Sequence, residues 1–173
     1  FFPGVPAQPV AIGIIAMATL INYSGVRTAG TIVNLLSIAT LSILFIFVII
    51  GSFFIHSTNF LPFTPFGIDG TLRASAIMFF AYVGFARPIY LVEEIKNPTE
   101  NVPKGIFLGL AASTVFYLLV TFTAIGLAGS PALGESSSPL ATAVSFTNLT
   151  WAPTLITIGA LIATFSVLLS DNV

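Results

Sequence analysis

The sequence predicts an all-α, multi-pass membrane protein, and three observations lead to this fold class. Hydrophobic residues make up 56% of the 173 residues and charged residues only 6%, with a mean hydropathy of +1.05. A soluble domain carries about 25% charged residues, so water is not the main solvent of this chain. Five nearly uncharged stretches reach the ~20 residues that an α-helix needs to cross ~30 Å of hydrocarbon. Polar and apolar residues show no strand-length alternation, which favours helices over strands.

The five stretches are predicted as spans over residues 7–26, 31–55, 74–92, 105–129 and 151–170 of a single transmembrane domain. Turn-forming residues mark their ends: Gly25 lies at the end of the first stretch, Pro62 and Pro65 lie after the second, Asn97-Pro98 follows the third, and residues 129–139 are rich in Gly, Ser and Pro. Because the chain begins with Phe1 and stops just after an apolar run, we expect it to be a fragment of a longer transmembrane protein.

The basic residues predict an orientation in the membrane. If the first span crosses from outside to inside, then Arg27, Lys96 and Lys104 fall on the cytoplasmic side and Arg73 falls outside, as the positive-inside rule favours. The expected location is therefore the cell membrane, with several crossings and the lipid bilayer as a partner.

Charge and composition exclude several other classes of function. The net charge is −1 and the charges are scattered, so no basic surface exists that could bind nucleic acid. The chain has no cysteine and one histidine, His56, which excludes cysteine chemistry and leaves no set of ligands for a metal site. We expect no bound cofactor, although coupling to H⁺ or Na⁺ remains open.

The third stretch contains three residues that are unfavourable in a plain lipid-facing helix: Gly84, Arg87 and Pro88. Pro88 has no N–H for the carbonyl of Gly84, where glycine already permits unwinding. Unwound backbone at membrane depth occurs only inside protein or beside a wet cavity, so the pattern predicts a binding site at a broken helix. The alternative is a simple proline kink, with Arg87 reaching toward the membrane interface.

Several segments carry a family resemblance. They are Asn22-Tyr23-Ser24-Gly25-Val26-Arg27, Val33-Asn34, Phe79-Phe80-Ala81-Tyr82-Val83-Gly84-Phe85, Glu93-Glu94-Ile95-Lys96-Asn97-Pro98 and Val102-Pro103-Lys104-Gly105-Ile106. Together and in this order, they resemble spans four to seven of the amino-acid permeases of the amino acid-polyamine-organocation (APC) superfamily. The resemblance covers essentially the whole chain. It implies spans four to eight of about twelve, in an inverted-repeat transporter fold with a discontinuous sixth span.

The resemblance also implies roles for residues of the third stretch. Phe80 would cover the substrate, the carbonyls of Ala81 and Val83 would lie near its ammonium group, and Gly84 and Phe85 would form the unwound turn. Many relatives carry an acidic residue directly after Gly-Phe, whereas this chain continues with Ala86-Arg87-Pro88. We hypothesise that Arg87 favours a substrate that is zwitterionic or has an anionic group over a dibasic one.

A second departure concerns ion coupling. Some proton-coupled relatives carry a lysine in the fifth span at the position that is Thr40 here. Coupling then uses another group, or a sodium ion binds near Thr40, Thr164 and Ser166, or transport is exchange without an ion. Each hydroxyl could instead donate a hydrogen bond to its own helix. In the fourth stretch, Gly105 and Gly109 have the small-xxx-small spacing that lets helices pack closely.

The function predicted from these features is secondary active transport of amino acids or related small amines by alternating access. Such a protein is not an enzyme, and its partners are the substrate, the bilayer and the missing spans of the same chain. A membrane-embedded enzyme would need a nucleophile, a metal cluster or paired acids inside the spans. An ion channel usually needs rings of polar residues around its pore. These two classes are the alternatives.

Overall fold

The computed structural model describes residues 7–23, 25–82, 84, 92 and 95–171. Among these residues every regular element is helical and no strand occurs, which confirms the all-α fold class. The long helices are α1 (Ala7–Tyr23), α2 (Val26–Ser52), α3 (Gly67–Phe80), α5 (Pro98–Gly134) and α7 (Ala152–Asp171). A 3-10 helix, η1 (Ser57–Phe60), precedes α3, and a short helix, α6 (Pro139–Ser145), precedes α7.

Three of the described helices are long and apolar enough to cross a membrane, in the segments Thr28–Ser52, Pro98–Gly134 and Ala152–Ser170. The apolar part of α1, Ala11–Tyr23, is shorter. Helix α3 has 14 residues and therefore a length of roughly 21 Å, less than the ~30 Å of a bilayer core. It ends at Phe80, inside the stretch 74–92, and the interruption predicted from Gly84, Arg87 and Pro88 lies largely outside the described residues.

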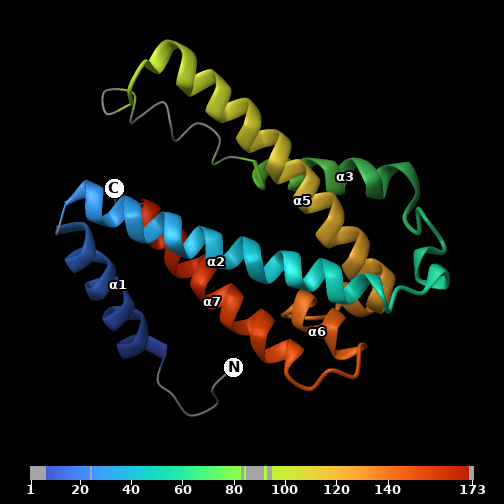
Figure 1. Ribbon diagram of the computed structural model, residues 1–173. Helices are drawn as coiled ribbons and strands as arrows, with labels where there is room; N and C mark the ends of the chain where they lie inside the picture. Colours follow the sequence, from blue (N-terminus) through green and yellow to red (C-terminus); the bar gives the residue numbers. More distant parts are fainter. Residues whose placement is uncertain (1–6, 24, 83, 85–91, 93–94, 172–173) are drawn as a thin grey trace.

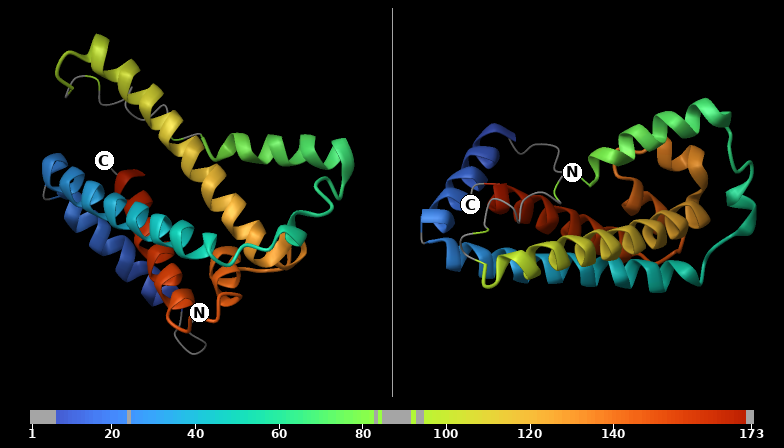
Figure 2. Two further views of the ribbon diagram at one scale, coloured as in Figure 1. Left: turned by 45° about the vertical axis from the view of Figure 1, so that its right-hand side comes forward. Right: turned by 90° about the horizontal axis from the view of Figure 1, so that it is seen from above.

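The helices form two groups that meet at one end (Figure 1). In the first group α2 packs along α7, and α1 lies against both. Helix α5 contacts α2, α6 and η1 through its C-terminal part, while its N-terminal part diverges from the first group (Figure 2). Helices α2 and α5 begin on the left of Figure 1 and α3 lies toward the right. The N-terminal ends of α2 and α5 thus lie on one side and α3 toward the other, while the orientation in the membrane stays a prediction.

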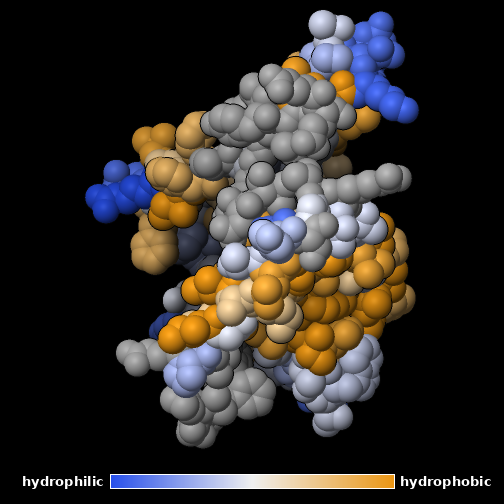
Figure 3. Space-filling model, turned by 90° about the vertical axis from the view of Figure 1, so that its left-hand side faces the viewer, coloured by the Kyte–Doolittle hydropathy of each residue, from blue (hydrophilic) through white to orange (hydrophobic). Residues whose placement is uncertain are grey.

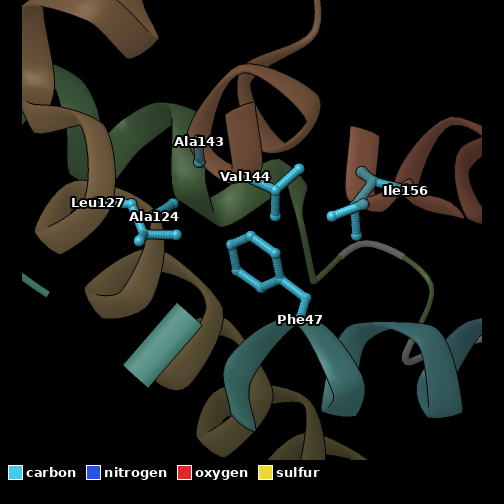
Figure 4. Packing of buried hydrophobic residues seen from close by; sticks show 7 residues of the cluster. Phe47, Ala124, Leu127, Ala143, Val144 and Ile156 are labelled. Carbon is cyan, nitrogen blue, oxygen red and sulfur yellow. The ribbon is translucent and has the colours of Figure 1, made fainter. Parts of the chain in front are cut away.

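A hydrophobic core fills the place where the two groups meet (Figure 4). The ring of Phe47 on α2 is 2% exposed and faces Leu127 of α5, which is also 2% exposed. Val144 of α6 and Ile156 of α7 close the cluster. Helices α2 and α7 approach closely at Gly159, where a Cβ would lie 2.9 Å from Cγ2 of Ile43. A larger residue at this position would therefore force the Ile43 side chain to shift.

Helix α5 is longer at both ends than the predicted stretch 105–129. It begins at Pro98 because proline is tolerated at the first helical position, where no backbone N–H is needed. It continues to Gly134 across a kink at Gly129, which has φ 76° and ψ 156°. Residues 139–145, expected to be loop, form α6, again with a proline in the first turn.

The kink in α5 is fastened to η1. The carbonyl of Leu127 would accept from residue 131 in a regular helix, but Pro131 has no N–H. The side-chain amide of Asn59 donates to this carbonyl at 3.1 Å and to the carbonyl of Gly126 at 2.8 Å. The backbone N–H of His56 also donates to the Gly126 carbonyl, at 2.9 Å. We call these three hydrogen bonds the η1 clamp.

Most of the apolar surface is not covered by other described residues. In the most apolar 18-residue windows of α2 and α5, only 6% and 0% of the residues are buried. Figure 3 shows hydrophobic side chains gathered over the lower centre and right of one face and again at its upper left, with strongly hydrophilic ones at the upper right and the left edge. Apolar surface of this extent belongs against lipid or against further helices. The chain is therefore part of a multi-pass membrane protein.

Candidate functional site

The C-terminal end of α3 forms the candidate site. The helix ends at Phe80, and the next two backbone N–H groups bond three residues back: Ala81 to the Met78 carbonyl at 3.0 Å and Tyr82 to the Phe79 carbonyl at 3.1 Å. This tightened turn is a usual way to end a helix, and it leaves the partial negative charge of a helix C-terminus at this point.

A cavity of about 330 Å³ adjoins this end of α3. Ala81, Tyr82 and Gly84 line one side, and α5 lines the other. A Cβ built on Gly84 would meet no described atom within 4 Å, so there is open space here. None of the described lining residues is charged, and their polar groups are hydroxyls and backbone. The lining residues from α5 are Gly105, Ile106, Gly109, Leu110, Ser113 and Tyr117.

The structure brings together only part of the set that the sequence predicts. Ala81 and Gly84 line the cavity, whereas Phe80 does not line it and is 73% exposed. Val83, Phe85 and Arg87 lie outside the described residues. The contribution of these three side chains therefore stays a prediction from the sequence.

Gly105 and Gly109, the two glycines of the small-xxx-small motif, do not lie against a neighbouring helix among the described residues. We predicted that Gly105 and Gly109 would pack closely against a neighbouring helix. A Cβ on either residue meets nothing within 4 Å among the described residues, and both line the cavity instead. Their lack of side chains widens the cavity on the α5 side.

Hydroxyl groups of α5 fasten the end of α3, a feature that the sequence analysis missed. The phenol of Tyr117 donates to the Ala81 carbonyl at 3.0 Å, and the phenol of Tyr82 lies 3.0 Å from Oγ1 of Thr114. The rings of Tyr82 and Tyr117 meet edge to face, with 5.4 Å between centroids. We call these contacts the tyrosine latch. The signal in the sequence is the spacing of Ser113, Thr114 and Tyr117, which places three hydroxyls on one face of a helix.

A second cavity, of about 530 Å³, lies between α2, α7 and the segment that leads into α6. Thr40 of α2 and Thr164 of α7 both line it, so two of the three ion-coupling candidates come together. Their hydroxyls donate to their own helices, Thr40 to the Leu36 carbonyl at 3.0 Å and Thr164 to the Ala160 carbonyl at 2.8 Å. The third candidate, Ser166, is buried on α7 and does not line this cavity.

Comparison with known proteins identifies similar sequences over almost the entire chain. A family model described as amino acid permease matches residues 6–172. The methylthioribose transporter of Bacillus subtilis (strain 168) is 33% identical over 162 residues, which cover 94% of this chain and 35% of that protein. The branched-chain amino acid permease BcaP of the same organism is 27% identical over 159 residues, 92% of this chain and 34% of the permease.

A plant protein extends the range of relatives. Cationic amino acid transporter 5 of Arabidopsis thaliana is 34% identical over 167 residues, 94% of this chain and 28% of the transporter. The chain thus spans about a third of the length of the curated relatives it matches.

Proposed function

Because the chain belongs to the amino acid permease family, we propose that the whole protein moves amino acids or related small amines across the cell membrane by alternating access. The relatives are named as transporters and permeases and not as enzymes, so the chain is part of a membrane transport protein. The observation that carries the proposal is the end of α3 beside an uncharged, partly polar cavity.

The chemistry of this cavity suits a small molecule with an ammonium group. The C-terminus of a helix carries a partial negative charge, and the carbonyl of Ala81 lies at that end. The hydroxyl of Ser113 adds a further polar group on the α5 side. Among the described residues no carboxylate lines the cavity, so backbone oxygens rather than an ion pair would bind the ammonium group. The volume of about 330 Å³ lies at the small end of the usual range for ligand pockets, which suits an amino acid.

Recognition of the substrate's charges other than the ammonium group involves residues beyond this cavity. Under the same proposal Arg87 selects against dibasic substrates, because a second cation on the substrate would be repelled by the guanidinium. Competition assays in an Arg87→Ala variant test this selection. Arginine should compete better against a neutral amino acid in the variant, and an unchanged ratio contradicts the assignment.

Sodium is the coupling ion that we propose to test first. A threonine hydroxyl that donates its proton to its own helix keeps its oxygen lone pairs for a cation. Thr40 and Thr164 present such oxygens to one cavity from two helices. Proton coupling through another group, or exchange without an ion, remains the alternative.

The test is uptake into proteoliposomes that contain the full-length protein, with and without a sodium or proton gradient. The panel of radiolabelled substrates holds leucine, arginine and methylthioribose, since relatives are named for branched-chain amino acids, cationic amino acids and methylthioribose. Saturable uptake of an amino acid supports the proposal. Uptake of methylthioribose alone contradicts the amine part of it, and current through the membrane without saturation indicates a channel.

Two variants and a control locate the site. Gly84→Leu and Gly109→Leu each place a side chain into the cavity from opposite sides, and both should abolish uptake. Gly134→Leu is the matched control, because a Cβ there also meets nothing within 4 Å but lies at the far end of α5. If the control transports normally and both cavity variants do too, the substrate does not use this cavity.

A further inference from the structure

The tyrosine latch fixes one acceptor that the proposed function needs. Ala81 is the first residue after α3, and its carbonyl oxygen accepts the phenol proton of Tyr117 at 3.0 Å. In a continuous helix this oxygen would accept from the backbone N–H four residues later. The phenol is instead a side-chain donor to this oxygen, supplied by α5.

The direction of each hydrogen bond in the latch follows from the available protons. The hydroxyl of Thr114 donates to the Leu110 carbonyl at 2.8 Å, so its single proton is used. Tyr82 must then donate to Thr114, and the oxygen of Thr114 is the acceptor. Tyr117 can only donate to Ala81, because a carbonyl has no proton. Each phenol thus holds one partner, and the two bonds are separate.

The Ala81 carbonyl can accept a second hydrogen bond beside that from Tyr117, its donor among the described residues. A carbonyl oxygen has two lone pairs, of which Tyr117 occupies one. Ala81 and Tyr117 both line the cavity of about 330 Å³. A ligand N–H in the cavity can approach the second lone pair while the phenol holds the oxygen in place. Such pre-positioning improves binding because the acceptor does not have to be ordered when the ligand arrives.

We propose that Tyr117 is a positioning residue that holds the Ala81 carbonyl for the ammonium group of the substrate and so makes the site selective for amines. This inference rests on the proposed function, since it concerns the same cavity. It differs from a general stabilising role, because only ligands that have an N–H donor at this place depend on the carbonyl.

The experiment measures selectivity between two ligands that differ only in the amine. The probes are leucine and 4-methylpentanoate, which is leucine without its amino group. Binding of each to the full-length protein in detergent is measured directly by equilibrium dialysis for the unmodified protein, for Tyr117→Phe and for Tyr82→Phe. Phenylalanine keeps the edge-to-face ring contact and removes only the hydroxyl.

The expected result is specific to one variant and one ligand. Tyr117→Phe should weaken leucine binding about 3- to 10-fold, the range that the loss of one hydrogen bond gives. Binding of 4-methylpentanoate should change less than about 2-fold, because no group of that ligand uses the carbonyl. Tyr82→Phe is the matched control: it removes the other latch bond and leaves the Ala81 contact, so the ratio between the ligands should stay the same.

Other outcomes overturn the inference. An equal loss for both ligands, or the same loss in both variants, makes the latch a purely structural contact. Tighter leucine binding in Tyr117→Phe means that the phenol competes with the ammonium group. If Tyr117→Phe does not fold, 3-fluorotyrosine at position 117 keeps the ring and alters the strength of the phenol as a donor, and an unchanged ratio between the two ligands then contradicts the inference. If the unmodified protein binds neither leucine nor arginine, the proposed function itself fails.

Discussion

The η1 clamp gives a stability prediction whose size follows from the structure. Replacing Asn59 by leucine removes two hydrogen bonds, to the carbonyls of Gly126 and Leu127. The Leu127 carbonyl lies in a residue that is 2% exposed, and its helical partner would be Pro131, which has no N–H. Losing its donor there costs about 1–3 kcal/mol. The Gly126 carbonyl keeps the backbone N–H of His56, so its loss is about 1 kcal/mol.

Asn59→Leu should therefore lower the free energy of unfolding by about 2–4 kcal/mol. The measurement is reversible unfolding of the full-length protein in mixed micelles with increasing denaturing detergent. Asn59→Asp, which has the same shape without the N–H donors, should lose at least as much. Thr58→Ala is the control, because Thr58 is an exposed neighbour on η1, and it should stay within about 0.5 kcal/mol. If the free energy of unfolding of Asn59→Leu equals that of the Thr58→Ala control, the η1 clamp does not stabilise the protein.

Three further predictions concern the core and the second cavity. Phe47→Ala should lower the free energy of unfolding by about 3–5 kcal/mol, since the ring is 2% exposed; Phe47→Leu in the same assay should lose much less. Gly159→Leu should lower the free energy of unfolding by at least about 1–3 kcal/mol, because the leucine overlaps the Ile43 side chain. The double variant with Ile43→Ala should recover part of this loss, and losses that simply add argue against the contact. If sodium uses the second cavity, Thr40→Val and Thr164→Val should each raise the sodium concentration for half-maximal uptake about 10-fold, and an unchanged value excludes this cavity.

The sequence predicts elements better than partners in this protein. Hydropathy alone indicates the helical stretches, and Gly84 and Pro88 indicate where one of them is interrupted. Periodicity says nothing about which residues meet across long separations. Tyr117 and Ala81 are 36 residues apart, and Asn59 and Leu127 are 68 apart. Both contacts involve polar groups in an apolar chain, and only the structure shows that η1 and the residues after α3 meet α5.

The ends of α5 show a second kind of difference. Prolines and glycines mark loops in most sequences, so the segments after Asn97 and Gly129 were expected to be connections. Pro98 instead begins a helix, because the first turn does not need its N–H. Helix α5 resumes after the kink at Gly129, where Asn59 donates to the Leu127 carbonyl in place of the N–H that Pro131 lacks. Local rules for turn residues fail where another element compensates for the missing hydrogen bond.

The η1 clamp and the tyrosine latch have a joint mechanical consequence. The segment that precedes α3 is tied to α5 at Gly126 and Leu127, and the segment that follows α3 is tied to the same helix at Tyr117. Between Tyr117 and Gly126 α5 is regular helix, about 14 Å long. The segment from η1 to Ala81 therefore has both of its ends held on α5, and α5 itself packs against Phe47 of α2 through Leu127. A displacement of this whole segment relative to α2 must break one of the two ties or disturb that core.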